Sequence, residues 1–300
     1  MSKKGRERPS AVVRGRWTPY LYLLPALLIY GGFLLYPVVR TAQFSLYEWS
    51  GFGPATFVGL DNYTSLVTDQ RFLAAISHAF YLILFYAILP LIVGLILAAI
   101  LRRGNVRGMG VYRVLIFVPQ VIALVVVAVA WRQIYTPNGT LNSMLGWIGI
   151  QSDIGWLGDP NLALTAVGII GFWLETGLVM LLLLAGMNRI PGELYEAARL
   201  DGAGPISEFF GITLPAVRPE IATSLVLTII AALKTFDLVY MTTSGGPGTA
   251  TTVPSYEVYN RAFQLKQVGS ASAVAVFLTV MVFCINVVVN RIGEEKKVSR

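Results

Sequence analysis

Charged residues, cysteine and histidine are all scarce in this chain of 300 residues. Only 13% of the residues are charged while 55% are hydrophobic, and the mean hydropathy is +0.66. This composition leaves too little polar surface to cover a water-soluble globule, so it predicts a membrane protein. The single Cys284 and single His78 also exclude a disulfide framework and a metal site built from cysteine and histidine clusters.

The sequence has no Gly-x-x-x-x-Gly-Lys-Ser/Thr motif, the loop that cradles nucleotide phosphates. Its polar loops carry no grouping of His, Cys or paired carboxylates arranged for catalysis, and His78 is expected to pack or to lie at the membrane interface. We therefore predict no catalytic residue, no metal ligand and no bound cofactor in this chain. Nucleotide has to be hydrolysed by another subunit if the chain is driven by ATP.

Long apolar runs are what the chain has in abundance. A helix needs about 20 apolar residues to cross a hydrocarbon core of about 30 Å, and six segments reach that length. The runs are continuously apolar rather than alternating, which favours helices over a β-barrel. The predicted fold is an all-α membrane protein with six transmembrane helices at 20–39, 80–101, 114–131, 162–187, 221–241 and 269–290. The predicted divisions are a basic tail 1–17, a membrane domain 18–292 that includes a polar loop 188–220, and a short tail 293–300.

The distribution of positive charge predicts the orientation. Of the 23 lysines and arginines, 17 fall in the two tails and in the second and fourth links, five fall in the other links, and Lys234 lies within a span. Because positive residues accumulate on the cytoplasmic side, both termini and the loop 188–220 are predicted to be cytoplasmic. The net charge of +7 then reflects membrane topology and contact with anionic lipid rather than nucleic acid.

The loop 188–220 contains residues that typically begin and end helices, in the order expected for a helical hairpin. Pro191 is placed to open a helix and Gly202 to close it, which predicts a short helix over 193–201. Gly204 and Pro205 would begin a second short helix. Loop composition alone leaves a solvated connector with chance helical character as an equal alternative.

A spaced motif in this loop distinguishes the two alternatives. Glu196-Ala197-Ala198 is followed after three residues by Gly202 and after nine more by Ile212-x-Leu214-Pro215. This spacing resembles the signature loop of permease subunits in ATP-driven ABC importers. Further segments agree with the carbohydrate-uptake type of such permeases, represented by those of maltose and glycerol-3-phosphate importers. These segments are 57–63, Asp159-Pro160, 190–195, Phe236-Asp237 and Gly245-Gly246-Pro247, and the resemblance covers roughly residues 18–292.

The resemblance implies a type I importer architecture in which the loop forms a coupling helix seated in a cleft of an ATPase subunit. The residues that match are Glu196, Ala197, Ala198, Asp201 and Gly202. The small alanines would permit insertion, the two carboxylates would pair with basic groups, and the glycine would let the chain turn. Glu196 would alternatively serve only to complement the helix dipole.

The same resemblance implies the partners and the location. A second, homologous permease would complete the pore, two ATPase subunits would bind ATP and magnesium, and an extracytoplasmic binding protein would deliver the solute. The chain would be a multi-pass protein of the bacterial inner membrane. Neither a soluble cofactor nor nucleic acid is implied.

Three ionisable residues fall within predicted spans, where an unpaired charge is costly and marks a functional candidate. They are Glu175, Lys234 and Asp237. Lys234 and Asp237 are three residues apart, so they are predicted to share one helical face and neutralise each other, with Glu175 as a possible third member. A buried ion-pair network that only holds helices in register is the structural alternative.

In the resembling importers the sugar lies midway across the membrane, between the helices that flank the signature loop. The matching positions here are Trp173, Glu175, Thr176, Gly177, Thr228, Lys234, Asp237 and Tyr240. An aromatic ring with polar groups around it suits a sugar, although Trp173 serves equally well as a packing residue. The Gly245–Pro247 segment predicts either an outer lid or a plain turn.

The predicted function is therefore that of a permease subunit importing a mono- or oligosaccharide. Glycerol-3-phosphate or a related polyol derivative is an alternative within the same architecture. A secondary transporter in which the ionisable residues relay protons is a further alternative, and a membrane-embedded enzyme is the least favoured.

Overall fold

The computed structural model describes residues 18–103, 108–150 and 153–294. The predicted tail 1–17 and all but the first two residues of the predicted tail 293–300 lie outside the described residues. The first half of the chain contains α1 (Thr18–Tyr30), α2 (Tyr36–Phe44), β1 (Tyr47–Glu48), β2 (Thr56–Phe57), α3 (Asp61–Thr68), α4 (Gln70–Ile83), α5 (Leu89–Arg103), α6 (Met109–Val121), α7 (Leu124–Ile134) and α8 (Thr140–Trp147). The second half contains α9 (Ala163–Met187), α10 (Gly192–Leu200), α11 (Pro205–Glu208), α12 (Leu214–Ala216), α13 (Arg218–Lys234), α14 (Asp237–Thr242), α15 (Pro254–Tyr259) and α16 (Val268–Glu294). Four π-helical turns, at Gly31–Leu35, Leu84–Ile88, Phe209–Thr213 and Asn260–Gln264, continue neighbouring helices.

The predicted helical membrane fold is confirmed. Within the described ranges, four helices are long and apolar enough to cross a membrane, or up to six if each of two bent pairs counts as one span. The four are Tyr20–Phe44, Gln70–Arg102, Ala163–Met187 and Val268–Arg291. The bent pairs are Gly110–Val121 with Leu124–Ile134, and Pro205–Ala216 with Arg218–Lys234.

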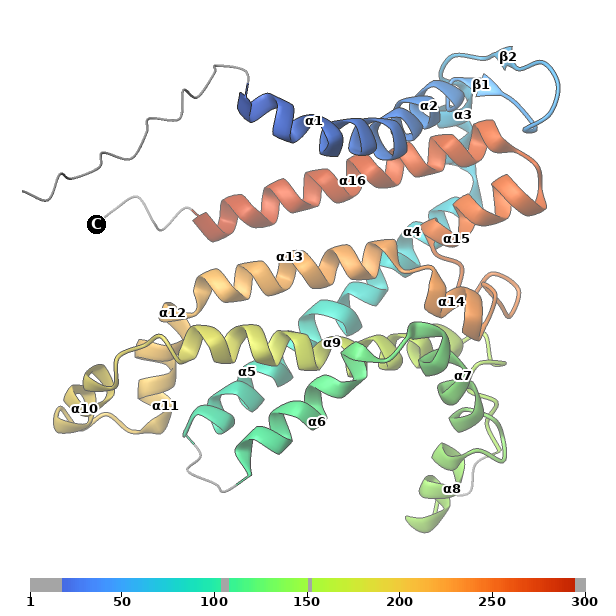
Figure 1. The fold of residues 1–300 in the computed structure, drawn as a ribbon. Coiled ribbons are helices and arrows are strands. Elements are labelled where there is room, and N and C mark those ends of the chain that lie inside the picture. The colour runs from blue at the N-terminus through green and yellow to red at the C-terminus, as the bar shows by residue number, and fades with distance from the viewer. Residues whose placement is uncertain (1–17, 104–107, 151–152, 295–300) are drawn as a thin grey trace, which may run out of the picture.

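Helix α9 forms the centre of the bundle. It runs between α13 and the pair formed by α5 and α6, and it contacts all three (Figure 1). Glycines on α9 permit this close packing: a Cβ added to Gly168 would lie 2.7 Å from the ring of Phe85, and one added to Gly171 would lie 2.0 Å from the ring of Tyr86. Small residues at helix interfaces have this role in membranes, where close van der Waals contact replaces the hydrophobic effect.

Two of the predicted spans are not continuous helices. The predicted helix 114–131 is broken at Ile122–Ala123, where α6 and α7 meet at 97°. The predicted helix 221–241 is broken at Thr235–Phe236, between α13 and α14. The sequence stays largely apolar across the first break, whereas Lys234, Thr235 and Asp237 interrupt the apolar run at the second.

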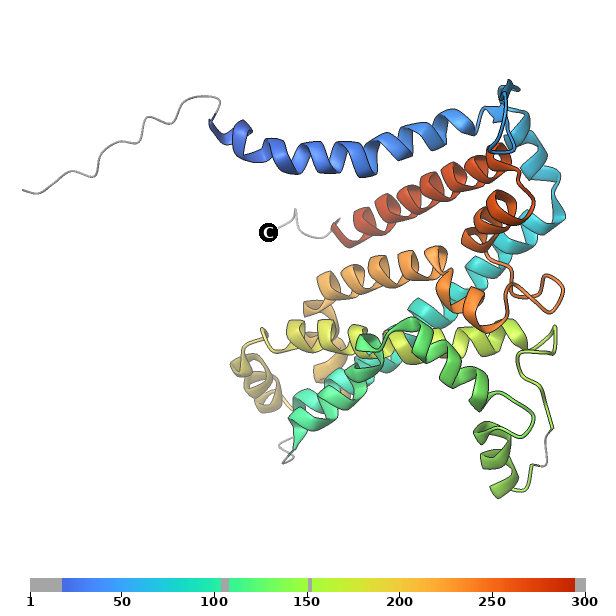
Figure 2. The same ribbon diagram turned by 45° about the vertical axis from the view of Figure 1, so that its right-hand side comes forward.

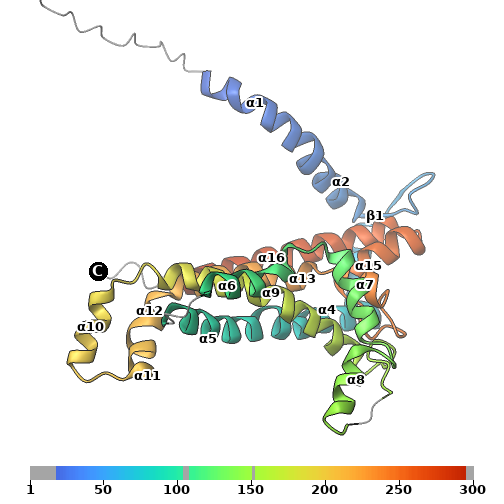
Figure 3. The ribbon, with the colours of Figure 1, turned by 60° about the horizontal axis from the view of Figure 1, so that its bottom comes forward.

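The first span stands apart from the rest of the bundle. None of the most apolar window of Tyr20–Phe44 is buried within this chain. Figure 2 shows α1 separated from α16, and Figure 3 shows α1 projecting away from the other helices, whereas α2 contacts α16. This apolar helix therefore requires lipid or another protein to cover it.

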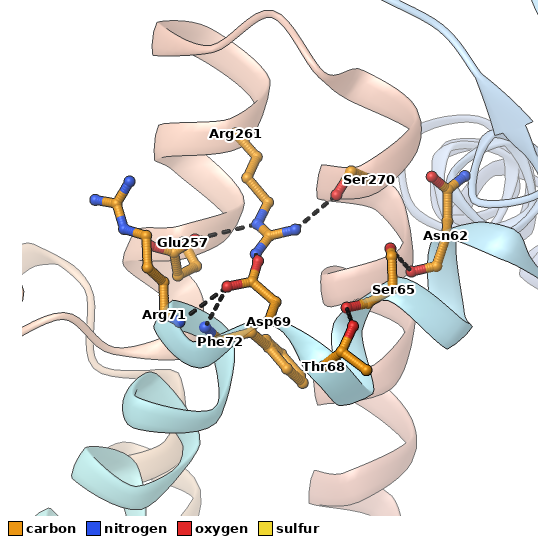
Figure 4. A network of polar contacts seen from close by, with 9 residues as sticks. All are labelled: Asn62, Ser65, Thr68, Asp69, Arg71, Phe72, Glu257, Arg261 and Ser270. Atoms are coloured by element: carbon orange, nitrogen blue, oxygen red, sulfur yellow. Dashed lines mark hydrogen bonds and ion pairs between the residues drawn. The ribbon is translucent and has the colours of Figure 1, made fainter.

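A buried ionic cluster holds together the end of the bundle opposite α10. Arg261 pairs with Asp69, donates from Nε to Glu257 at 3.1 Å, and donates from Nη1 to Ser270 at 2.7 Å (Figure 4). Asp69 also caps α4 by accepting the backbone N–H of Arg71 at 2.9 Å. Burial alone would raise the pKa of Asp69, but these donors and the charge of Arg261 hold that pKa below its ordinary value.

We expect Arg261→Gln to destabilise the protein strongly. The side chains of Arg261 and Glu257 are 7% and 2% exposed, and Glu257 Oε1 already has no hydrogen-bond partner among the described residues. Removing the guanidinium would leave a buried carboxylate unpaired, which costs about 3–5 kcal/mol. Thermal unfolding of the purified assembly measures the effect.

Arg71→Gln is the matched control for this change. Arg71 lies beside the same cluster but its side chain is exposed, so its removal should alter the free energy of unfolding by no more than about 0.5 kcal/mol. Equal melting temperatures for the two variants would contradict the role given to Arg261.

Candidate functional site

The loop 188–220 forms the predicted helical hairpin. Helix α10 begins after Pro191 and ends at Leu200, and the chain then turns at Gly202, whose φ is +84°. Helix α11 begins at Pro205, directly after an extended Gly204. The two helices stand at one end of the bundle, away from the membrane-spanning segments (Figure 3). The loop is thus helical on both sides of the turn, as the hairpin prediction requires.

The five residues assigned to coupling lie together on this hairpin. Four of them are exposed, and the fifth is half-buried. In chain order they are Glu196, Ala197, Ala198, Asp201 and Gly202, with Ala198 the half-buried one. The hairpin therefore leaves two carboxylates and small residues accessible to solvent.

The hairpin also presents large apolar side chains that the sequence reasoning did not assign to the site. Leu200 is 90% exposed, Ile206 is 75% exposed and Phe210 is 61% exposed. An apolar group on an otherwise polar projection is characteristic of a protein-binding surface. Leu200 and Ile206 are near the turn at Gly202, a position that the predicted helix boundaries indicate, whereas Phe210 lies in the π-helical turn after α11.

An ion pair ties the two halves of the hairpin together. Arg199 Nε on α10 donates to Glu208 Oε1 on α11 at 2.8 Å. Glu208 is buried while the Arg199 side chain is largely exposed, and the interaction with Glu208 raises the pKa of Arg199. The pair fixes the spacing of α10 and α11 around the turn.

The α9 residues of the predicted substrate path differ in their accessibility. Trp173 is 38% exposed and its ring packs edge-on against Trp131 of α7, with centroids 5.7 Å apart. Glu175 is buried, and no hydrogen bond or ion pair holds its carboxylate in the described part of the chain. Thr176 is also buried and donates to the carbonyl of Phe172 at 2.6 Å. Glu175 thus keeps the properties of a functional candidate.

Gly177 and Thr228 lie in packed positions of this chain. A Cβ on Gly177 would lie 2.3 Å from the carbonyl oxygen of Ile116, so this glycine lets α6 approach α9. Thr228 is 1% exposed and donates to the carbonyl of Ser224, one turn earlier in α13, at 2.8 Å. Their surroundings are those of helix packing.

The predicted pairing of Lys234 with Asp237 is wrong. Lys234 is the last residue of α13 and Asp237 is the first of α14, so the two do not share a helical face. Both are exposed, and neither takes part in an ion pair with the other or with Glu175 among the described residues. The i, i+3 rule failed here because it holds only within one continuous helix.

The two helix breaks precede two short helices that pack against each other. Helix α14, which follows the break at Thr235–Phe236, packs against α7, which follows the break at Ile122–Ala123. Tyr86 and Thr235 share a hydrogen bond of 3.2 Å between their hydroxyls beside the second break. Non-helical backbone at membrane depth is tolerated only where protein buries it or where it lines a water-filled cavity. Lys234 and Asp237 flank this break.

Tyr240 belongs to an aromatic group that the sequence reasoning did not identify. Its ring stacks on Phe236 with centroids 5.3 Å apart and meets Tyr259 edge-on at 5.1 Å. Tyr256 and Phe263 extend the group, and Phe263 is 72% exposed. The rings come from α14, α15 and the π-helical turn after α15, which are separated by a loop, so no local spacing indicates that they meet.

Internal hydrogen bonds fix the conformation of the loop between α14 and α15. Thr251 donates to the carbonyl of Gly246 at 2.8 Å, and Thr252 donates to that of Gly245 at 3.1 Å. The carbonyl of Thr252 also lies 2.8 Å from His78 Nδ1, which gives His78 a packing role. Among the described residues, no group of three or more His, Cys, Asp or Glu is placed to hold a metal ion.

Comparison with known proteins identifies a family model that matches residues 90–294, described as "Binding-protein-dependent transport system inner membrane component". The trehalose/maltose transport system permease protein MalF of Thermococcus litoralis is 35% identical over 93% of this chain and 94% of its own length. The sn-glycerol-3-phosphate transport system permease protein UgpA of Escherichia coli is 34% identical over 95% of this chain and 97% of its own.

A solved structure agrees with these relatives. A chain of a bacterial ABC transporter that imports the acidic polysaccharide alginate superposes with a TM-score of 0.82 at 25% identity. The superposition covers 94% of this chain and 96% of that one. The similarity therefore includes nearly the whole membrane bundle.

Proposed function

The chain belongs to the family of binding-protein-dependent ABC transporter permeases, and on that premise we propose that it forms half of a pore that imports a carbohydrate. As a permease it is the non-catalytic membrane component of its transporter, and ATP is handled by a partner ATPase. The alternatives of proton-coupled secondary transport and of a membrane-embedded enzyme are set aside by this membership. The finer assignments of substrate, coupling residues and orientation are our proposals.

The hairpin of α10 and α11 is the observation that carries the proposal. It is a helical projection with exposed Glu196 and Asp201 beside the exposed apolar side chains of Leu200 and Ile206. We assign it to docking on an ATPase subunit, with Glu196, Ala197, Ala198, Asp201 and Gly202 at the contact. Closure of two ATPase subunits would push on this hairpin and on its counterpart, opening the pore to alternate sides.

The orientation follows from the same hairpin and from nearby basic residues. The hairpin, the last turn of α5, the first turn of α6 and the end of α16 lie at one end of the bundle (Figure 1). Arginines gather at that end, at positions Arg102, Arg113, Arg189, Arg199, Arg218 and Arg291. We assign this end to the cytoplasm, because positive residues accumulate there and the ATPase needs cytoplasmic ATP.

The pore requires a second permease of the same kind. The uncovered apolar surface of α1 and α2 supports this pairing, as does the exposure of Lys234 and Asp237 beside a mid-bundle break. In a complete pore these two residues would face a cavity shared by both subunits, where charges are tolerated. An extracytoplasmic binding protein would deliver the solute from the side of α3 and α15, and the whole would reside in the bacterial inner membrane.

A carbohydrate is the substrate class that the open residues suit best. Trp173 and the aromatic group around Tyr240 offer ring faces and hydroxyls, while Glu175, Lys234 and Asp237 offer polar contacts. Flat apolar rings bordered by a few polar groups recognise the apolar face and the hydroxyl edge of a sugar. Gly177, Thr228 and the neighbouring Thr176 would influence the shape of the path indirectly, by setting how closely the helices around it pack.

Reconstitution in proteoliposomes tests the proposal. The complete assembly, containing both permeases, the ATPases and the binding protein, should accumulate a radiolabelled sugar only when ATP is enclosed with the ATPases. Uptake that continues without ATP and collapses with a protonophore would contradict it.

Lys234→Gln distinguishes a neutral sugar from an anionic polyol phosphate, the second candidate. An exposed lysine at a path residue favours the anion. If a phosphate binds here, loss of the charged hydrogen bond should reduce uptake roughly tenfold or more. Because we propose a neutral sugar, we expect uptake by Lys234→Gln to fall less than about threefold. Competition assays should also show that neutral sugars displace the transported solute. Lys266→Gln, in the loop before α16, is the control for loss of a lysine elsewhere.

A further inference from the structure

We propose that Arg102 is a positioning residue that makes the second span move with the coupling hairpin. This inference rests on the proposed function, because it concerns how a push on α10 reaches the membrane helices. Arg102 lies in the last turn of α5, and it is 93 residues from the tyrosine of α10 that it contacts. The chain itself links α10 to the spans through α9 and α13, which precede and follow the hairpin, and this contact adds a direct link to α5.

The guanidinium of Arg102 joins three segments. One of its nitrogens donates to the hydroxyl of Tyr195 on α10, and another donates to the carbonyl of Ile190 at 3.1 Å. Its central carbon also lies 4.3 Å from the centre of the Tyr195 ring. The Tyr195 hydroxyl in turn lies 2.8 Å from Thr213 Oγ1, on the returning arm of the hairpin. Arginine suits this role because its planar fork reaches two acceptors at once and stacks on an aromatic face.

These contacts cross a space that side chains do not fill. A cavity of about 590 Å³ separates the ends of α5 and α9 from the inner faces of α10 and α11. Ala99 and Met187 border it on the side of the spans, and Glu196 and Phe209 border it on the side of the hairpin. Phe209 and Ile190 pack against the spans beside this cavity, while the guanidinium of Arg102 reaches across it from α5 to α10. Tyr195 is only 8% exposed, and its contact with Arg102 is the one through which α5 follows a movement of α10.

The helix that Arg102 holds is itself packed tightly against α9. The ends of α5 and α9 nearest the hairpin share one apolar core cluster, which also includes the residue preceding α13. Its buried members are Ala98, Leu101, Val179, Met180, Leu183, Leu184, Met187 and Val217. A displacement of α10 that carries Arg102 therefore moves this cluster as one body, because packed interiors transmit displacement.

The test is the amount of solute transported per ATP hydrolysed by the reconstituted assembly. For Arg102→Gln we expect ATP hydrolysis to continue while transport per ATP falls about fivefold or more, the lower end of typical coupling between sites. Arg102→Lys, which keeps the charge but lacks the fork, should fall between Gln and the parent. Tyr195→Phe keeps the ring and loses only the hydroxyl, so it should fold normally and still reduce the ratio.

Two controls match these changes. Arg291→Gln removes a positive charge at the same end of the bundle, in the last turn of α16. Tyr112→Phe removes a hydroxyl from an exposed tyrosine of α6. Both should keep the parent ratio. If Arg102→Gln and Tyr195→Phe lower uptake and ATP hydrolysis equally, so that the ratio is unchanged, the positioning role is overturned. If Glu196→Trp also leaves uptake intact, the coupling assignment itself fails; if Glu196→Trp abolishes uptake, only the inference about Arg102 fails.

Discussion

Replacing Gly202 with valine is expected to abolish solute uptake while leaving the protein folded in the membrane. Gly202 has a φ of +84°, a left-handed conformation that costs a β-branched residue about 1–2 kcal/mol or more. A Cβ there would meet no atom within 4 Å, so the strain lies in the backbone of the turn and not in packing. The turn would relax by changing the angle between α10 and α11.

The consequence should appear in coupling rather than in assembly. A reoriented α10 would present Glu196 and Leu200 to the ATPase in the wrong geometry, and we expect uptake below about a tenth of the parent rate, equivalent to a loss of about 1.4 kcal/mol. Uptake and ATP hydrolysis are measured in proteoliposomes, and membrane insertion is measured by quantitative immunoblotting.

Gly204 provides a control within the same hairpin. It too has open space around its Cβ position, but its φ is −83° and its ψ is 171°, which valine adopts readily. Gly204→Val should therefore retain uptake within about twofold of the parent. If both valine variants transported normally, the geometry of this turn would have no part in coupling.

The hairpin could be predicted from the sequence because its signals are local. Pro191 and Pro205 fix their own φ angles, and Gly202 permits the left-handed φ of the turn, so their positions alone indicate the helix boundaries. The four long spans were predictable for a similar reason, since the bilayer requires one apolar helix length wherever a chain crosses it.

The helix breaks could not be predicted in this way. The break at Ile122–Ala123 lies within a continuously apolar run, and the only local sign is Pro119 within α6, three residues earlier. The break at Thr235–Phe236 has no proline near it. Both breaks depend on packing between helices, such as that of α14 on α7, which hydropathy does not encode.

The candidate substrate path was only partly predictable for the same reason. The intramembrane positions of Glu175 and Lys234 follow from the spans, but their exposure depends on tertiary packing: Glu175 is buried and Lys234 is open. Tyr240 was found by its match to a family position, whereas Tyr259 and Phe263 were not, because a loop separates them from α14 and only the fold brings the rings together.

The close contact of α6 with α9 predicts the second large effect. We expect Gly177→Leu to prevent accumulation of folded protein and Gly177→Ala to lower its stability by about 1–3 kcal/mol. A Cβ at this position would lie 2.3 Å from the carbonyl oxygen of Ile116 and 2.9 Å from the Cα of Phe117. Both atoms are backbone, so neither can rotate away and α6 would have to move as a whole.

Gly110→Ala separates this packing cost from the intrinsic effect of replacing a helical glycine. Gly110 lies in α6 with nothing within 4 Å of its Cβ position, so alanine there should stabilise the helix by up to about 1 kcal/mol. Thermal unfolding and size-exclusion yield of the assembly compare the two variants. A direct substrate role for Gly177 predicts the opposite pattern, with Gly177→Ala showing normal stability and altered solute affinity. Because Gly177 is buried against α6, we expect its alanine variant to keep the parent solute preference in whatever fraction assembles.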